Sequence, residues 1–403
     1  MDSTTADHAS QGAGMTVAFA QRTDGLRLEG AYQVLARAQE LEARGKDIIH
    51  LEIGEPDFPT PENISRAAAD AIAAGKTHYN PSAGLRELRA AIAEDAGRRR
   101  GLTFGPEQVV VSPGAKPNLF FPALALVNPG EEVIYPDPGF PTYEAMIRVT
   151  GGVGRPAPLL ESNGFSIDRD SLARLVNART RLIILNSPGN PTGGVIPLAD
   201  LEFVADLAQR HDCWVLSDEI YSRITFAGRS VPTIAALPGM RERTILLDGF
   251  SKTYAMTGWR LGYGIMPEPL AERVSLLLNH GLGCTAHFTQ IAGIEALTGP
   301  QDSVDRMVAE FHRRRDRIVD GLSRLRGVRC CNPEGAFYVF PNIEGTGLSC
   351  EAFAARMLEG GVALLPGTAF GEHGAGYVRL AFTNSVEAID RALERMDIVL
   401  RAL

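Results

Sequence analysis

Five short apolar runs, rich in valine, leucine and isoleucine, constrain the fold of this 403-residue chain most strongly. Each run is shorter than a typical helix and is followed by turn or helix signals, which is the pattern of strands joined by helical crossovers. Because the runs are nearly all apolar rather than alternating, they are typical of strands buried on both faces. The sequence therefore predicts an α/β fold with a mostly parallel central sheet wrapped by helices. The predicted strands are residues 109–112, 132–135, 182–186, 213–218 and 244–248.

The pattern changes after residue 300 and predicts a second, smaller domain of α+β type. A long helical stretch at 302–325 is followed by short strands within 335–341 and 377–381 and by a closing helix from Val386. The helical stretch 30–45 is expected to pack with this part, which would make the small domain discontinuous. We expect a flexible N-terminal tail over residues 1–24, a small domain over 25–60 plus 300–403, and a large domain over 61–299.

Charge and cysteine usage exclude several classes of function. The net charge of −8 argues against nucleic acid or an anionic membrane as partner, since both require a broad basic surface. The arginine runs 98–100 and 313–315 are expected to lie on solvated helix faces. Five cysteines without CxxC spacing indicate neither a metal site nor a disulfide framework. With no apolar stretch of about 18 residues and no secretory signal, the expected compartment is the cytoplasm.

Polar and glycine residues gather where predicted strands end, which is where open α/β sheets bind ligands. The first cluster, Ser112-Pro113-Gly114-Ala115-Lys116-Pro117, precedes a helical run; a small-residue turn at a helix N-terminus suits a phosphate, although an ordinary helix start looks the same. The second cluster, at 186–193, ends a strand with rigid turn residues that would hold the Asn190 amide at a ligand. A purely structural loop is the alternative.

Three further clusters carry charged groups. Asp218 ends an apolar strand, where a carboxylate needs a cation such as a protonated pyridine nitrogen; the alternative is a helix N-cap. Lys252 lies in the glycine-rich string 249–262, where a lysine can form a Schiff base, and Arg260 follows eight positions later and could neutralise a phosphate. Arg379 lies in a short apolar strand and requires a carboxylate from the protein or from a substrate.

These five clusters, in this order, resemble the class I and II aminotransferases, which are fold-type I pyridoxal 5′-phosphate (PLP) enzymes, and especially the bacterial aspartate-aminotransferase-like subgroup. The resemblance runs from about Gly30 to the C-terminus, and the string 249–262 matches the PLP-attachment signature. It implies that the large domain binds PLP. It also implies a ping-pong transfer of an amino group from an L-amino acid to a 2-oxo acid, commonly 2-oxoglutarate, in a homodimer.

The resemblance also assigns roles to individual residues. Lys252 would carry PLP and move the α-proton, Asp218 would keep the ring nitrogen protonated, and Tyr221 and Asn190 would hydrogen-bond the ring 3′-oxygen. Tyr79 would reach the phosphate in the neighbouring subunit. Further cofactor contacts are expected from Gly114, Ala115, Lys116, Phe140, Ser251 and Arg260, and substrate contacts from Gly54, Asn190 and Arg379.

Two departures from the family pattern bear on specificity and on the phosphate contacts. Gly249 replaces a serine that many relatives use for the phosphate. Lys116 matches a lysine that some relatives use to bind an acidic substrate side chain, which favours an aspartate-like donor, but Glu29 could neutralise it. A PLP-dependent C–S lyase on the same fold would keep the same motifs and stands as the alternative.

Overall fold

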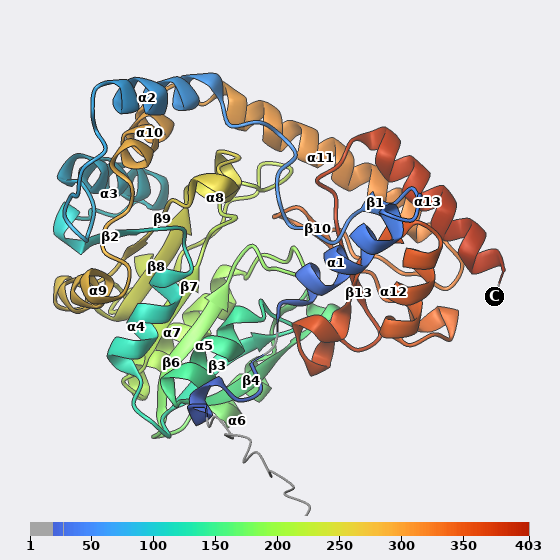
Figure 1. Ribbon diagram of the computed structural model, residues 1–403. Helices are drawn as coiled ribbons and strands as arrows, with labels where there is room; N and C mark the ends of the chain where they lie inside the picture. The colour runs from blue at the N-terminus through green and yellow to red at the C-terminus, as the bar shows by residue number, and fades with distance from the viewer. Residues whose placement is uncertain (1–18, 27, 403) are drawn as a thin grey trace, which may run out of the picture.

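The computed structural model describes residues 19–26 and 28–402, so most of the predicted N-terminal tail lies outside the described residues. A single eight-stranded sheet, ordered β2-β9-β8-β7-β6-β3-β4-β5, forms the centre of the larger body in Figure 1. The neighbours from β8 to β4 are parallel, whereas β9 and β5 run antiparallel to their neighbours. Its strands are β2 (Val109–Ser112), β3 (Glu132–Asp137), β4 (Val153–Leu160), β5 (Ser166–Ile167), β6 (Thr180–Asn186), β7 (Trp214–Asp218), β8 (Thr244–Gly249) and β9 (Gly262–Ile265).

Helices cover both faces of this sheet, which confirms the predicted α/β class. Alternate residues of each strand point to opposite faces, so Val110 packs toward α4 and α9 whereas Val109 and Val111 pack toward α3 and α10. The half of that second face near β6 is covered by α6 and α7. These helices are α2 (Glu62–Ala73), α3 (Arg86–Arg100), α4 (Pro117–Leu126), α5 (Thr142–Thr150), α6 (Arg169–Leu175), α7 (Leu198–Arg210), α8 (Phe250–Thr253), α9 (Glu268–Gly281) and α10 (His287–Thr298).

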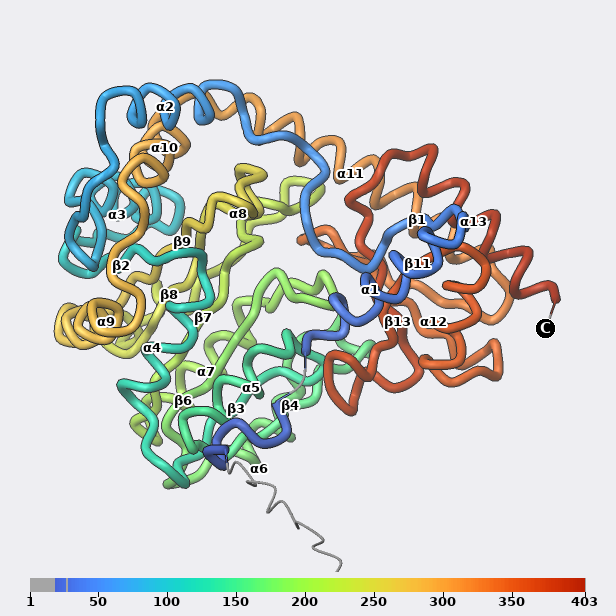
Figure 2. Tube along the Cα trace, viewed as in Figure 1, coloured from blue at the N-terminus to red at the C-terminus, as the bar shows by residue number. Residues whose placement is uncertain are grey.

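The smaller body combines segments from both ends of the chain, as Figure 2 shows. Strand β1 (Ile49–His50) pairs in parallel with β11 (Val362–Ala363), and a three-stranded sheet is formed by β10 (Tyr338–Val339), β13 (Val378–Ala381) and β12 (Leu365–Pro366). The long α11 runs along the top of Figure 1 from one body to the other. The domain boundaries themselves remain a prediction. The helices are α1 (Gly30–Glu42), α11 (Asp302–Ser323), α12 (Cys350–Glu359) and α13 (Val386–Arg401).

The expectation that both arginine runs lie on solvated faces is wrong for most of their members. The side chain of Arg100 is buried and lies 2.7 Å from Glu219 and 3.2 Å from Asp248. Arg314 is likewise buried and pairs with Asp57 at 2.7 Å. A buried guanidinium is tolerated because carboxylates from distant segments compensate it, and that pairing is not visible in a local charge run.

Within residues 19–26 and 28–402, no helix is long and apolar enough to cross a membrane. The same residues bring no three metal-ligating His, Cys, Asp or Glu side chains together. All five cysteines are free.

Candidate active site

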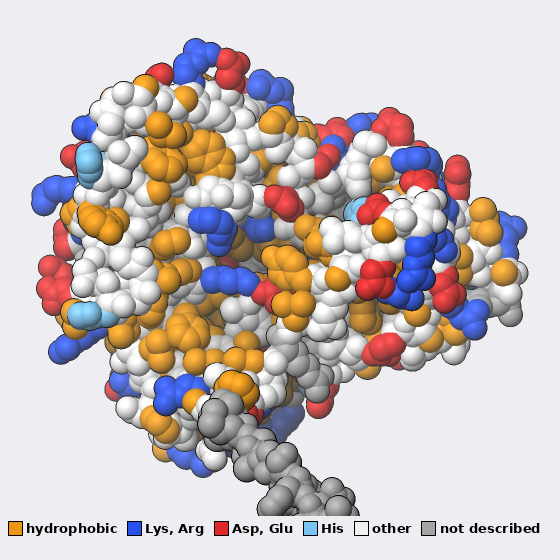
Figure 3. Space-filling view, in the orientation of Figure 1, with side chains coloured by type: hydrophobic (Ala, Val, Ile, Leu, Met, Phe, Trp, Pro, Cys, Tyr) orange, Lys and Arg blue, Asp and Glu red, His pale blue; other side chains and the backbone are white. Residues whose placement is uncertain are grey.

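A cavity of about 520 Å³ opens at the carboxyl edge of the large sheet, where the two bodies meet. Figure 3 shows this face hollowed between them, with lysine or arginine side chains beside the hollow. Strands β2, β6, β7 and β8 all end at this edge because they run in the same direction. The predicted residues that line the cavity are Gly54, Ala115, Lys116, Phe140, Asn190, Asp218, Tyr221, Ser251, Lys252, Arg260 and Arg379.

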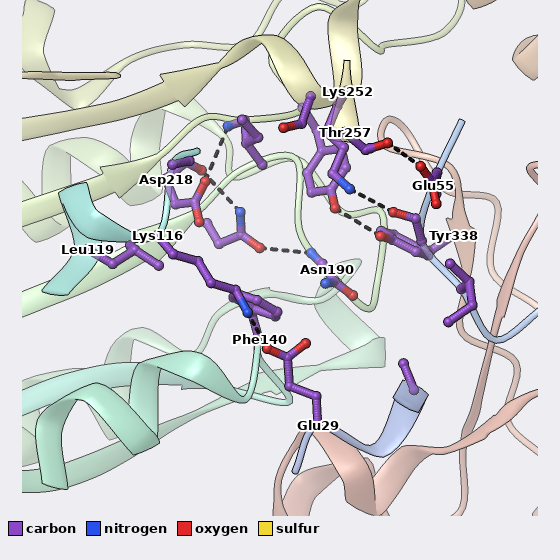
Figure 4. A pocket seen from close by; sticks show the side chains of 18 of the residues that line it. Glu29, Glu55, Lys116, Leu119, Phe140, Asn190, Asp218, Lys252, Thr257 and Tyr338 are labelled. Carbon is purple, nitrogen blue, oxygen red and sulfur yellow. Dashed lines mark hydrogen bonds and ion pairs between the residues drawn. The ribbon is translucent and has the colours of Figure 1, made fainter. Parts of the chain in front are cut away.

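Lys252 lies in the single-turn helix α8, directly after β8, and its side chain enters the cavity (Figure 4). Its Nζ donates a hydrogen bond to the Gly54 carbonyl at 2.6 Å. Burial, together with the nearby cations Arg379, Arg260 and Lys116, lowers the pKa of this amine to about 8, although Glu55 opposes the shift. A lysine with such a pKa is available as a neutral nucleophile near physiological pH.

Asp218 ends β7 as a buried carboxylate without a cationic partner among the described residues. Its Oδ2 accepts a hydrogen bond from the Tyr143 hydroxyl at 2.7 Å, and its Oδ1 accepts one from the Ile220 N–H at 3.2 Å. Burial raises its pKa to about 6 although both hydrogen bonds oppose the rise. No helix begins here, so Asp218 is not an N-cap, and a cationic ring nitrogen in the cavity would supply the missing partner.

Arg379 in β13 is a buried guanidinium with no carboxylate at ion-pair distance in the part of the chain that the structure describes. It lies between the rings of Tyr338 and Phe370, 4.5 and 4.9 Å from their centroids. Nη1 donates to Asn190 Oδ1 at 3.1 Å, Nη2 donates to the Glu52 carbonyl, and Nε has no partner. An uncompensated planar cation in a cavity suits a ligand carboxylate.

The other end of the cavity forms a cradle for an anion at the start of α4. Gly114 has a φ of +82°, and a Cβ there would lie 2.1 Å from Arg260 Nη2, so only glycine lets this guanidinium approach the turn. The Ser112 hydroxyl donates to the Gly114 carbonyl at 2.6 Å and fixes the turn. The first amides of a helix together with an arginine fit a phosphate.

The loop after β6 and the loop after β3 complete the cavity walls. The Asn186 side chain accepts a hydrogen bond from the Asn190 N–H at 2.8 Å and thereby holds the Asn190 amide near Arg379. Phe140 presents a ring to the cavity and makes an edge contact with Tyr143, with centroids 5.7 Å apart. Tyr221 is buried, and its hydroxyl lies 2.9 Å from that of Tyr338.

One predicted residue lies apart from the rest. Tyr79 is 97% exposed and borders a different hollow together with residues 284 and 286–288. Conversely, Tyr143 and Tyr338 were not singled out from the sequence. Tyr143 belongs to the string around Phe140 and could have been found there, whereas the apolar run around Tyr338 carries no signal of function.

This arrangement fits PLP: an amine of lowered pKa for the aldehyde, an unpaired carboxylate for the ring nitrogen, a cradle for the phosphate and an aromatic ring for stacking. The fold and the site together define a PLP-dependent enzyme of fold type I. The chain belongs to the class I and II aminotransferases, because the family model "Aminotransferase class I and II" matches residues 46–396.

Individual relatives agree with this family. An aromatic-amino-acid aminotransferase 2 from Thermococcus litoralis is 40% identical over 88% of this chain and 92% of its own length. An arginine–pyruvate transaminase from Pseudomonas aeruginosa is 40% identical over 91% of this chain and 92% of its own. The solved structure of aspartate aminotransferase from Thermus thermophilus with maleate aligns with a TM-score of 0.91 at 36% identity, covering 95% of this chain and all of that one. The protein is therefore a PLP-dependent transaminase, and the lyase alternative is not favoured.

Proposed function

We propose that the protein transfers the α-amino group of an L-amino acid to a 2-oxo acid, with 2-oxoglutarate as acceptor, and that both substrates use the same cavity in turn. The observation that carries this proposal is the buried Arg379, which lines the same cavity as the Lys252 amine and has no carboxylate partner within the described residues. Both substrates of a transamination have an α-carboxylate, and one fixed guanidinium can bind either. The bound cofactor supplies the sink for the electrons left at Cα.

The side chains of this chain would bind and orient the reactants. Arg379 and Asn190 hold the α-carboxylate, which places Cα beside the Lys252 amine. Lys252, once free of the cofactor, would take the proton from Cα and deliver it to C4′ of the cofactor. Asp218 keeps the ring nitrogen protonated, and Tyr221 donates a hydrogen bond to the ring 3′-oxygen. The distances and burial described above support these roles.

Phosphate and ring contacts complete the proposed cofactor site. Gly114 and Ala115 would donate backbone N–H groups to the phosphate, next to Ser251 and the Arg260 guanidinium. Phe140 would stack on the ring. Lys116, also expected to contact the cofactor, has its amine beside Phe140, with Nζ 5.3 Å from the ring centroid.

The test is a half-reaction screen of the purified yellow protein. Adding one L-amino acid without an oxo acid should bleach the cofactor band once, and 2-oxoglutarate should restore it. Continuous release of pyruvate and ammonia without an acceptor would instead identify a lyase. Lys252→Ala, which removes the amine, should show neither bleaching nor covalent cofactor attachment, and activity in that variant would contradict the proposal.

The choice of donor side chain depends on the pair formed by Lys116 and Glu29 at the rim of the cavity (Figure 4). Thr142 also donates to Glu29 Oε1, at 3.2 Å. The side chains of Lys116 and Glu29 are 50% and 26% exposed, so the pair contributes only about 0.2–1 kcal/mol. We propose that an acidic side chain, such as that of aspartate or 2-oxoglutarate, displaces Glu29 from Lys116 at this small cost. Donors with a neutral side chain would bind while Glu29 stays paired with Lys116.

Glu29→Gln tests this part of the proposal. Without the competing carboxylate, the KM values for aspartate and 2-oxoglutarate should fall about fivefold, since about 1 kcal/mol corresponds to that factor, while the KM for phenylalanine stays unchanged. Lys116→Gln is the matched variant and should raise the KM for the two acidic substrates only. Equal effects on acidic and neutral substrates would contradict the exchange.

We further propose a homodimer in which Tyr79 of one subunit reaches the phosphate of the other. The exposed position of Tyr79, outside the cavity of its own chain, supports this proposal.

The free cysteines fit a reducing compartment, which supports the cytoplasm as the location of the protein. Pairing of β1 with β11 supports the division into a discontinuous small domain, 25–60 plus 300–403, and a large domain, 61–299.

A further inference from the structure

Two buried phenols meet at the cavity wall. The hydroxyls of Tyr221 and Tyr338 lie 2.9 Å apart, and this contact is drawn as a dashed line at Tyr338 in Figure 4. A phenol has one proton to donate and can also accept a hydrogen bond. The contact therefore uses one of the two protons and leaves the other for a different acceptor.

The surroundings of Tyr338 decide which phenol supplies the shared proton. Its oxygen is pressed against the backbone, since a Cβ at Gly54 would lie 2.0 Å from it, and it makes no other hydrogen bond within the described residues. One face of its ring carries the Arg379 guanidinium, 4.5 Å from the centroid. Tyr338 thus has a single acceptor within reach, the Tyr221 oxygen.

Tyr221, by contrast, has an acceptor in the proposed function, because its proton goes to the ring 3′-oxygen of the cofactor. Its oxygen can then take part in the pair only as an acceptor. Tyr338 needs the Tyr221 oxygen as its acceptor, and Tyr221 needs its own proton for the cofactor. One arrangement of protons satisfies both needs: Tyr338 donates to Tyr221, and Tyr221 donates into the cavity. A hydrogen bond received by Tyr221 also polarises its O–H group and makes it a better donor.

We propose that Tyr338 is a positioning residue: its hydroxyl directs the Tyr221 proton toward the cofactor, while its ring supports the Arg379 guanidinium that binds the substrate carboxylate. The Tyr338 side chain thereby acts on both the cofactor, through Tyr221, and the substrate carboxylate, through Arg379. The inference rests on the proposed function and assigns a role to a residue for which the motifs gave no signal.

Tyr338→Phe removes the hydroxyl and keeps the ring under Arg379. In the yellow resting enzyme the cofactor absorbance changes with pH as the proton shared with the ring oxygen is lost. Weaker donation from Tyr221 stabilises the deprotonated oxygen less, so we expect the midpoint of this spectral titration to rise by about half a pH unit to one unit. The KM for the amino donor should stay near the wild-type value, because Arg379 keeps its aromatic neighbour.

The control is the same substitution in a Tyr221→Phe background. Tyr221→Phe alone should raise the midpoint at least as much, and adding Tyr338→Phe should then shift it no further, because Tyr338 acts only through Tyr221. An unchanged midpoint in the single variant, or a full additional shift in the double variant, overturns the inference.

Tyr338→Leu tests the second half of the role. Loss of the ring should raise the midpoint as Tyr338→Phe does and also raise the donor KM about 30-fold, as expected for a desolvated cation–π contact. A donor KM equal to that of Tyr338→Phe would refute the support of Arg379. A wild-type protein that never becomes yellow with PLP would instead refute the proposed function itself, so the two failures are distinct.

Discussion

At the scale of single residues, we expect the pKa of the Lys252 amine to control how readily the protein acquires its cofactor. Only the neutral amine attacks an aldehyde, and burial lowers the pKa of this amine to about 8 from the ordinary 10.5. A lowered pKa means that the neutral form is present above about pH 8 and is lost as the pH falls below it. The rate at which cofactor-free protein captures PLP should therefore rise with pH to a plateau with a midpoint near pH 8.

Stopped-flow absorbance after mixing with PLP measures this rate. Lys252→Ala should give no covalent product after borohydride treatment. A midpoint near 10 in the wild type would mean that the amine is solvated and not buried as described.

Arg379 offers a test that separates substrate binding from cofactor binding. Its guanidinium faces the cavity, and the phosphate cradle at Gly114 and Arg260 is formed by other segments. Arg379→Ala should raise the KM for the amino donor by about 10- to 100-fold, since charge-assisted hydrogen bonds contribute about 1.5–3 kcal/mol. PLP affinity, measured by fluorescence titration, should change little.

Arg379→Lys is the matched variant for that measurement. It keeps the positive charge but lacks the planar fork, so its KM should lie between the wild-type and alanine values. Equal losses of donor and PLP affinity in Arg379→Ala would mark the arginine as structural.

At the scale of elements, the sequence predicted the parallel strands well because burial on both faces leaves a nearly continuous apolar run. Each of the five predicted strands is present within two residues at either end. Three strands of the large sheet were not predicted: β4 is partly exposed and interrupted by prolines, β5 has only two residues, and β9 contains two glycines in four residues. Local composition therefore reveals a strand only where the sheet buries it with bulky side chains.

The residues of the candidate site likewise fall into two groups: those that the local sequence predicted and those that only the fold reveals. Asp218 and Lys252 were predicted because a charge at the end of an apolar strand is conspicuous within one segment. The Tyr143 contact to Asp218 and the Tyr338 contact to Tyr221 join residues 75 and 117 positions apart, so the fold alone reveals them. The burial of Arg100 and Arg314 escaped prediction for the same reason.

The turn before α4 gives a prediction at this scale. Gly114→Ala combines a left-handed backbone with a Cβ placed 2.1 Å from Arg260 Nη2. The backbone alone costs about 1–2 kcal/mol, and the displaced guanidinium should additionally weaken phosphate binding. We expect at least a tenfold loss of PLP affinity together with a lower Tm.

Gly101→Ala is the matched control for this variant. Gly101 ends α3 with a φ of +66°, and a Cβ there meets nothing within 4 Å. Its Tm should fall by a similar amount while PLP affinity is retained. Equal PLP affinities for the two variants would contradict the role of the glycine turn as a cradle.

At the scale of the whole molecule, the cavity is shared by segments that are distant in sequence. Gly54 and Arg379 come from the parts predicted to form the small domain, whereas Lys252 and Asp218 come from the large sheet. A change in how the two bodies sit against each other would therefore alter the distance between the Arg379 guanidinium and the Lys252 amine. We therefore expect a partner that contacts both bodies to change substrate binding.

A second copy of the chain is the partner that we expect, and Tyr79 marks the face concerned. Cys284, Ala286 and Phe288 border both the hollow beside Tyr79 and the hollow beside Ile72, so the two side chains belong to one face. Ile72 on α2 is 50% exposed. An exposed apolar side chain next to an outward-facing tyrosine is typical of an interface.

We therefore expect light scattering to give about twice the chain mass of 43.4 kDa, and Ile72→Asp to give a monomer, because an unpaired carboxylate would be buried on association. Ile398→Asp is the matched control: Ile398 is 68% exposed on α13, in the other body, and its substitution should leave the dimer intact. Tyr79→Ala should lower PLP affinity without changing the mass, if the tyrosine completes the phosphate site of the neighbouring subunit as proposed. A monomeric Ile72→Asp protein that binds PLP as tightly as the wild type would show that each cavity is complete by itself.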